Sequence, residues 1–224
     1  MLDNRRLQPQ CTGNCLPGVT TLEAGRWYPV CECSLAIAPP KIGPWITECH
    51  SMTKTLEASF DGTVEVQVLS ERLDAVFADE QLALGNADPM ARIREVLLKI
   101  GDGAVVTART VIPAETFEEM YATFTELGTR PLGHVLFELE AVRRLTADLA
   151  LLDFSFPLLA HVRDVCGYRD PDLRFWGRRN LFSLGGFPLL LTEIFLPPAF
   201  DPENAIPDPV IRPDFQRPIP LQRS

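Results

Sequence analysis

The sequence is poor in basic side chains relative to acidic ones, and it contains no long apolar run. Its 21 Lys and Arg residues are outnumbered by 30 Asp and Glu residues, which gives a net charge of −9. This balance argues against a general binder of nucleic acids or anionic membranes, because such affinity comes from clustered basic side chains. No stretch approaches the ~20 apolar residues of a membrane span, and the start of the chain contains no apolar signal segment. We therefore expect a cytoplasmic protein with no membrane span and no nucleic-acid partner.

The sequence also lacks the motifs of nucleotide-dependent enzymes and of hydrolases with a catalytic triad. Its two glycine turns, at 101–103 and 185–186, are too short for a phosphate-binding loop and lie between expected strands. The histidines have no Ser or Cys nucleophile at a recognisable spacing, which argues against a triad. These histidines are His50, His134 and His161.

Cysteines are few and are poorly spaced for a metal site. The six positions are 11, 15, 31, 33, 49 and 166. Structural zinc sites favour two to four residues between the members of each ligand pair, whereas Cys31 and Cys33 are separated by one. We expect reduced thiols, no bound metal and no organic cofactor, and an N-terminal zinc site is the alternative.

The length and composition predict one domain with irregular ends. A hydrophobic content of 46% over 224 residues is ample for a full core. Residues 1–44 mix Pro, Gly and Cys without periodicity, and residues 197–224 contain eight of the chain's 20 prolines. We expect an irregular N-terminal extension over 1–44, a folded domain over 45–197 and a Pro-rich tail over 198–224 that is extended or wraps on the domain surface. A monomer is expected.

Hydrophobic periodicity and turn residues predict two β-hairpins. Residues 92–100 and 104–112 flank the first glycine turn, and residues 176–184 and 187–196 flank the second. The other expected elements are a helix at 51–57, a strand at 64–68, helices at 116–127 and 155–166, and a segment at 139–152 whose type is ambiguous. Hairpins with a few helices indicate the α+β class, with a single antiparallel sheet and flanking helices.

Two charged residues fall at core positions of the expected strands. Glu193 is the only charged residue in an apolar run at 187–196, and alternation places Arg94 on the same face as Val96 and Leu98. A buried charge must be paired, neutralised or hydrogen-bonded. One interpretation is a small cavity that binds a carboxylate through Arg94 and a hydroxyl through Glu193. The other is an ion pair between the two residues in the core, and spacing alone does not separate them.

Six blocks between about 45 and 197 resemble, in order, the motifs of the chorismate lyase (chorismate pyruvate-lyase) family. The blocks are Trp45 followed by SMTKTLE at 51–57, REVLL at 94–98, ARTVIP at 108–113, LGTRPLG at 127–133, FWGRR at 175–179 and PLLLTEIFLP at 188–197. The resemblance implies a chorismate lyase-like catalytic domain that converts chorismate to 4-hydroxybenzoate and pyruvate without a cofactor. This reaction is the entry step to the ubiquinone head group.

The resemblance also implies roles for individual residues. The arginine that binds the ring carboxylate falls on Arg94, and the glutamate that binds the hydroxyl falls on Glu193, which are the two catalytic candidates. Backbone contacts to the ligand fall on Met52 and Leu132. Whether Glu193 also removes the C4 proton is left open.

A second cation should bind the enolpyruvyl carboxylate of chorismate. The candidates besides Arg94 are Arg109, Arg143, Arg178 and Arg179, and we expect Arg109 to fill this role ahead of Arg178 and Arg179.

The chain departs from the family pattern in three places, and two other functions stay open. Ala108 replaces a usual glycine, Asn180 replaces a usual serine, and an insertion lies between Phe137 and Phe175. One alternative function is a non-catalytic, effector-sensing domain that binds an aromatic acid; residues 1–44 contain no helix-turn-helix pattern to support it. The other is a lyase that makes a different hydroxybenzoate isomer.

Overall fold

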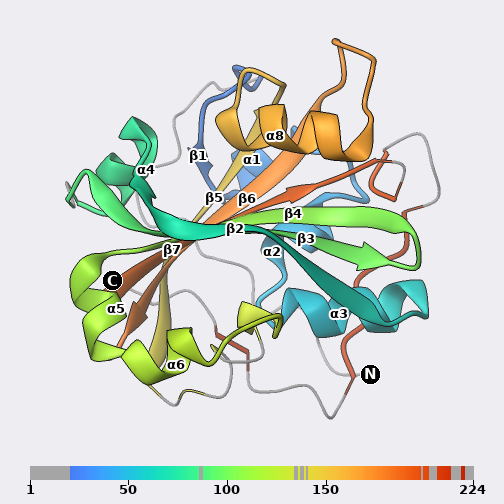
Figure 1. Ribbon diagram of the computed structural model, residues 1–224. Helices are drawn as coiled ribbons and strands as arrows, with labels where there is room; N and C mark the ends of the chain where they lie inside the picture. Colours follow the sequence, from blue (N-terminus) through green and yellow to red (C-terminus); the bar gives the residue numbers. More distant parts are fainter. Residues whose placement is uncertain are drawn as a thin grey trace.

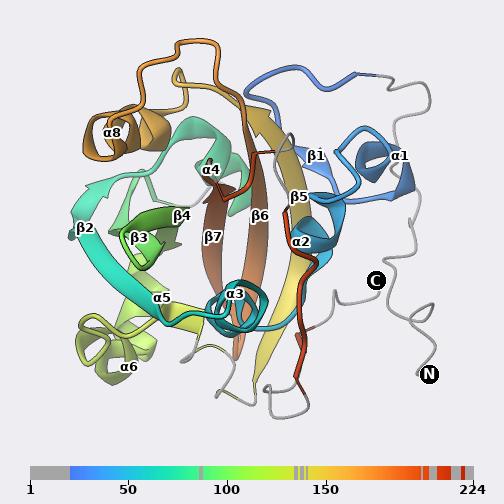
Figure 2. The same ribbon diagram turned by 90° about the vertical axis from the view of Figure 1, so that its right-hand side faces the viewer.

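Seven antiparallel strands form one sheet in the order β1-β5-β6-β7-β4-β3-β2 (Figures 1 and 2). The computed structural model describes residues 21–85, 88–133, 136, 139, 141–197, 199–201, 206–212 and 218–219. The strands are β1 (Tyr28–Pro29), β2 (Val64–Ala75), β3 (Met90–Ile100), β4 (Gly103–Ile112), β5 (Val142–Leu152), β6 (Phe175–Leu184) and β7 (Phe187–Phe195). The helices are α1 (Glu32–Leu35), α2 (Gly43–Thr47), α3 (Met52–Phe60), α4 (Ala78–Ala83), α5 (Ala114–Glu119), α6 (Tyr121–Thr125) and α8 (Pro157–Cys166). This architecture confirms the expected α+β class with a single antiparallel sheet.

Both predicted hairpins are present, and the turn of each contains glycine with a positive φ angle. Gly101 has φ of 58° between β3 and β4, and Gly185 and Gly186 have φ of 62° and 111° between β6 and β7. A residue with a side chain rarely adopts these angles, so glycine at these positions fixes the turns.

The two faces of the sheet carry separate apolar clusters. On one face Trp45 of α2 and Leu56 of α3 pack with Phe195 of β7. On the other face Leu159 and other residues of α8 pack against apolar residues of β3 and β7. Figure 1 shows the result, with α8 above the sheet and α3, α5 and α6 below it.

The predicted helices are present with altered bounds. Helix α3 begins after Ser51 and ends at Phe60, and the next residue, Asp61, takes the left-handed conformation at φ of 49°. The helix expected over 116–127 is divided at Met120 into α5 and α6. The helix expected at 155–166 is α8, which ends at Cys166 and is followed by Gly167 with φ of 70°. None of the described helices is long and apolar enough to cross a membrane.

The expectation of an irregular segment over 1–44 is wrong for residues 21–44. Strand β1 pairs with β5 through Tyr28 and Leu149, and Ile42 is fully buried just before α2. Elements of two to five residues are too short to show a periodicity, which is why the sequence did not reveal them. Residues 1–20 lie outside the described part of the chain.

Described parts of the Pro-rich tail pack on the domain. Phe200 and Ile206 are buried in the same cluster as Trp45, and the backbone N–H of Ile219 donates to the carbonyl of Cys49 at 3.0 Å.

Candidate active site

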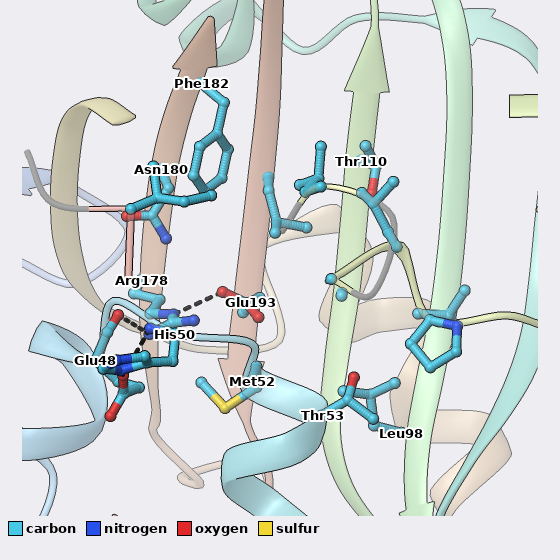
Figure 3. A pocket seen from close by; sticks show the side chains of 18 of the residues that line it. Glu48, His50, Met52, Thr53, Leu98, Thr110, Arg178, Asn180, Phe182 and Glu193 are labelled. Carbon is cyan, nitrogen blue, oxygen red and sulfur yellow. Dashed lines mark hydrogen bonds and ion pairs between the residues drawn. The ribbon is translucent and has the colours of Figure 1, made fainter. Parts of the chain in front are cut away.

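A cavity lies on the side of the sheet that faces α3. Its walls come from the middle strands, from the segment that leads into α3 and from residues 131–133, and Figure 3 shows many of the side chains that line it. The space open to the centres of water molecules is about 60 Å³, several times the roughly 10–15 Å³ that a single water requires. The cavity can therefore hold a small organic ligand.

Four of the five residues predicted to bind a ligand line this cavity. They are Met52, Arg94, Leu132 and Glu193. Met52 is the first residue of α3, and the chain next to Leu132 approaches the same helix start, since a Cβ on Gly133 would lie 3.0 Å from Oγ of Ser51. The fold thus brings these residues to one site, and their roles in binding stay predictions.

Arg94 is buried, with 3% exposure, and is held from two sides. Its Nη1 donates to a carboxylate oxygen of Glu71 directly opposite on β2, and its Nη2 donates to the carbonyl of Gly128 at 2.6 Å. The Glu71 side chain keeps 31% of its surface exposed. Because a guanidinium has more N–H donors than these contacts use, Arg94 can still bind a ligand carboxylate in the cavity.

Glu193 pairs with Arg178 and not with Arg94. Nε of Arg178 donates to the Glu193 carboxylate at 2.6 Å, between residues that face each other on β6 and β7 (Figure 3). Nη1 of Arg178 also donates to the carbonyl oxygens of Trp45 and Glu48, at 3.0 and 2.8 Å. The alternative in which Arg94 and Glu193 neutralise each other in the core is therefore wrong.

Arg109 lies on the opposite face of the sheet, so the expectation that it binds substrate in this cavity is wrong. Its strand neighbours Ala108 and Thr110 line the cavity, and alternation directs the Arg109 side chain away from it. The guanidinium donates to Glu80 from Nε and to Glu95 from Nη1, both at 2.8 Å. Arg109 is 2% exposed, which makes this a buried ionic network.

Residues 48–50 add an acid, a thiol and an imidazole to the cavity wall. A carboxylate oxygen of Glu48 lies 2.6 Å from Nδ1 of His50 (Figure 3). Sγ of Cys49 lies 4.0 Å from the same nitrogen. Hydrogen bonds with Cys49 and with Glu48 raise the pKa of His50 to about 9. Burial raises the pKa of Glu48, but the hydrogen bonds from His50 outweigh it, and the net pKa lies below its ordinary value. His50 is therefore an imidazolium at neutral pH.

The same three residues place potential metal ligands close together. One ligand atom from each lies within 4.8 Å of the other two. A metal would have to displace the proton that Glu48 and Cys49 hold on His50, because only the neutral ring has a free lone pair. The zinc site considered for the N-terminal cysteines involves Cys11 and Cys15, which lie outside the described residues.

Replacing His50 with glutamine is expected to lower the melting temperature at pH 6 but not at pH 9.5. Because the folded-state pKa of about 9 lies above the ordinary value of 6.5, the contribution of the charged ring is full below pH 6.5 and is lost as the pH rises through 9. A pair of this kind contributes on the order of 1 kcal/mol, or about 2–4 °C for a chain of this size. Thermal melts of both proteins at the two pH values measure the effect. An equal difference at both would show that the charge of His50 plays no part.

Arg144 on β5 is a cavity residue that the sequence did not reveal. Alternation back from Ala147 would place Arg143 on the inner face. A β-bulge between Arg144 and Thr146 shifts the register, so Arg144 pairs with Phe182 and lines the cavity. Arg144 is 6% exposed, whereas Arg143 lies on the surface. In the sequence, the only indication of an irregular strand was that the type of element at residues 139–152 could not be decided.

The three departures from the family pattern occupy different places. Ala108 and Asn180 both line the cavity, so the Ala108 methyl group fills space that a glycine would leave to the ligand. The insertion lies in the segment between Phe137 and Phe175, which contains β5 and also α8, the helix that packs on the face opposite to the cavity.

The fold and the cavity define an α+β protein with a cavity, lined in part by cationic side chains, between its sheet and the start of a helix. The family model described as chorismate lyase matches residues 22–205. The probable chorismate pyruvate-lyase of Thiobacillus denitrificans is 37% identical over 74% of this chain and 87% of its own length. That of Methylococcus capsulatus is 36% identical over 72% and 98%, and the chorismate pyruvate-lyase of Pectobacterium atrosepticum is 33% identical over 72% and 80%. The chain belongs to the chorismate lyase family.

Solved structures resemble this chain at a lower level. The C-terminal domain of PhnF superposes with a TM-score of 0.47 at 12% identity, over 62% of this chain and 86% of that domain. The effector domain of PhnF from Mycobacterium smegmatis gives 0.44 at 15%, over 66% and 90%. Scores at this level carry no argument about function.

Proposed function

We propose that this protein is a lyase that converts chorismate to 4-hydroxybenzoate and pyruvate, and that it supplies the ring of the ubiquinone head group. The observation that carries the proposal is a buried arginine and a buried glutamate in one cavity, at the positions that the family uses for the two ends of a para-substituted ring. Arg94 lies on β3 and Glu193 on β7, with β4 between them. We further propose that the protein acts as a monomer.

The cavity binds the ring of chorismate at its two polar ends. Arg94 binds the ring carboxylate through the planar fork of its guanidinium, and Glu193 accepts a hydrogen bond from the C4 hydroxyl. The first N–H groups of α3 have no partner within the helix, and Ser51 makes no side-chain cap hydrogen bond to them. The N–H at Met52 is therefore available to an anionic ligand, with the backbone at Leu132 beside it.

The reaction needs positioning and charge stabilisation more than a reactive group. The C4–H bond and the C3–O ether bond break, the electron pair of C4–H completes the aromatic ring, and enolpyruvate leaves and becomes pyruvate by taking up a proton. Aromatisation drives the reaction, so no metal or organic cofactor is required. The protein holds the dianion in one geometry and places Arg178 and the His50 imidazolium, both in the cavity wall, where charge develops on the departing enolpyruvate.

Turnover of chorismate is expected to survive exhaustive treatment with a chelator, because the chemistry assigns no step to a metal. Loss of chorismate and formation of 4-hydroxybenzoate are followed with chelated protein, with untreated protein as the control. Activity that disappears and returns only with zinc would contradict the cofactor-free mechanism. It would instead indicate metal binding by Glu48, Cys49 and His50.

4-Hydroxybenzoate is expected to bind at least about tenfold more tightly than benzoate, because only the hydroxylated ring satisfies Glu193. Tight binding of product would make its release slow relative to chemistry. Titration calorimetry measures both affinities, and 3-hydroxybenzoate is the control, since its hydroxyl points away from Glu193 when its carboxylate is held at Arg94. Equal affinity for all three acids would remove the role assigned to Glu193.

A further inference from the structure

Among the residues that the structure describes, four cationic side chains line the cavity, and three of them form an ion pair with a carboxylate. The three ion pairs are Arg94 with Glu71, Arg178 with Glu193 and His50 with Glu48. The fourth cation is Arg144, which forms no ion pair with any residue in the described ranges. Among the described residues of the cavity wall, Arg144 is thus the cation without a carboxylate partner in an ion pair.

The hydrogen bonds of Arg144 are few and long. Nη1 donates to the carbonyl of Glu48 and to Oδ1 of Asn180, both at 3.3 Å. Nε is buried and has no hydrogen-bond partner. Arg178, on the neighbouring strand, makes three hydrogen bonds of 2.6 to 3.0 Å. Arg144 thus keeps donors for an additional partner at a position that is 6% exposed.

An unpaired buried cation lowers the free energy of unfolding unless a ligand anion pairs with it. Removing a guanidinium from water disfavours its charged form, and the uncompensated charge destabilises the fold. Burial, together with repulsion by Arg178, lowers the pKa of Arg144 to about 10. The side chain is still a cation at neutral pH, so an anion that enters the cavity would remove much of this cost.

The geometry of chorismate directs its second carboxylate toward this side of the cavity. The enolpyruvyl ether is attached to C3, next to the carbon that bears the hydroxyl. With the ring carboxylate at Arg94 and the hydroxyl at Glu193, the C3 substituent leaves the ring at the Glu193 end. Strand β6 separates Glu193 on β7 from Arg144 on β5, and its residue Asn180 contacts Arg144 directly.

We propose that Arg144 is the binding residue for the enolpyruvyl carboxylate, with its unused donors meeting the carboxylate oxygens. This assignment rests on the proposed function and adds to it the residue that distinguishes the substrate from the product. Arg144 takes the role that the sequence assigned to Arg109. Since 4-hydroxybenzoate lacks the second carboxylate, Arg144 should contribute to binding of chorismate and little to binding of product.

Two aromatic acids that differ at one group isolate this contact. 3-(Carboxymethoxy)-4-hydroxybenzoate carries a carboxylate on an ether at the same ring position as chorismate, and 3-ethoxy-4-hydroxybenzoate carries a methyl group instead. Neither can be turned over, because both rings are already aromatic. The unaltered protein is expected to bind the carboxymethoxy acid at least about tenfold more tightly, as for a charge-assisted hydrogen bond.

Calorimetric titration of Arg144→Met tests the assignment. We expect the preference for the carboxymethoxy acid to fall below about threefold, while affinity for 4-hydroxybenzoate changes by less than about threefold. The melting temperature should stay equal or rise, because the substitution removes an unpaired buried charge. Arg143→Met, which removes the exposed neighbour, is the matched control and should retain the full preference.

Several results would overturn the assignment. They are absence of the preference in the unaltered protein, its survival in Arg144→Met, an equal loss of 4-hydroxybenzoate affinity, or failure of the variant to fold. Chorismate kinetics separate this inference from the proposed function. An unaltered protein that shows the preference but does not turn over chorismate would refute the lyase activity and leave the carboxylate site standing. Turnover by Arg144→Met with an unchanged KM would refute the site and leave the lyase activity standing.

Discussion

Replacing Arg109 with alanine is expected to reduce the free energy of unfolding by about 3–5 kcal/mol, which corresponds to a fall in melting temperature of roughly 6–20 °C. The substitution would strand the carboxylates of Glu80 and Glu95, which both accept hydrogen bonds from Arg109 at 2.8 Å. Glu80 is 1% exposed, and burial raises its pKa even with Arg109 in place. Chemical denaturation and thermal melts measure the loss.

A combined variant serves as the control for the Arg109 prediction. Changing Glu80 and Glu95 to glutamine together with Arg109→Ala removes the stranded charges, so part of the lost stability should return. Arg109 lies on the face away from the cavity, so the folded fraction of the single variant should bind 4-hydroxybenzoate as the unaltered protein does. A stable Arg109→Ala protein that no longer binds 4-hydroxybenzoate would show that Arg109 contacts the ligand after all.

Replacing Arg94 with alanine is expected to weaken binding of 4-hydroxybenzoate by at least about tenfold, because a charge-assisted hydrogen bond contributes ~1.5–3 kcal/mol. Arg94→Lys should also fail, since a point charge cannot reproduce the two-pronged geometry of a guanidinium. Folding should largely survive, because the partner left behind, Glu71, keeps 31% of its side chain in contact with solvent. Titration calorimetry and thermal melts on the same preparations measure both effects.

Glu71→Gln separates a ligand-binding role of Arg94 from a structural one. This variant removes the ion pair but keeps the guanidinium in the cavity wall. Product affinity close to that of the unaltered protein is expected. If Glu71→Gln and Arg94→Ala instead lost stability equally and neither lost affinity, Arg94 would be a structural partner of Glu71 only.

The sequence predicted the hairpins and two cavity residues because local rules determine both. Glycine at the turns limits where β3 can meet β4 and where β6 can meet β7. Within a regular strand, alternation determines which side chains share a face, and this placed Arg94 on an inner position correctly. The continuous apolar run around Glu193 predicted the burial of that residue. What alternation could not show was the partner of each charge. Glu71 lies on β2, which is not part of a predicted hairpin, whereas the register of the predicted hairpin of β6 and β7 sets Arg178 directly opposite Glu193.

The misassignment of Arg109 is explained by a β-bulge, which leaves no clear sequence signal. At the first hairpin Ile100 pairs with Gly103, and continuing that register would set Arg94 opposite Arg109. A shift between Leu98 and Lys99 sets Arg94 opposite Thr110 instead.

The second bulge, after Arg144, has the same effect on β5 and exchanges Arg143 for Arg144 on the inner face. A shift of one residue turns every later side chain to the other face, so the wrong role of Arg109 and the missed Arg144 follow from one missing kind of information. The partner of Arg109 was equally hidden, because Glu80 lies on α4, a helix of six residues.

The most direct test of the central claim is incubation of the purified protein with chorismate, with the aromatic acid and pyruvate identified and quantified by NMR in the same sample. The account predicts 4-hydroxybenzoate and pyruvate in equal amounts, at a rate that falls in Arg94→Ala. Chorismate that is bound but unchanged would indicate an effector-sensing domain, and 3-hydroxybenzoate as the product would indicate a lyase of different regiochemistry. Either result would contradict the account.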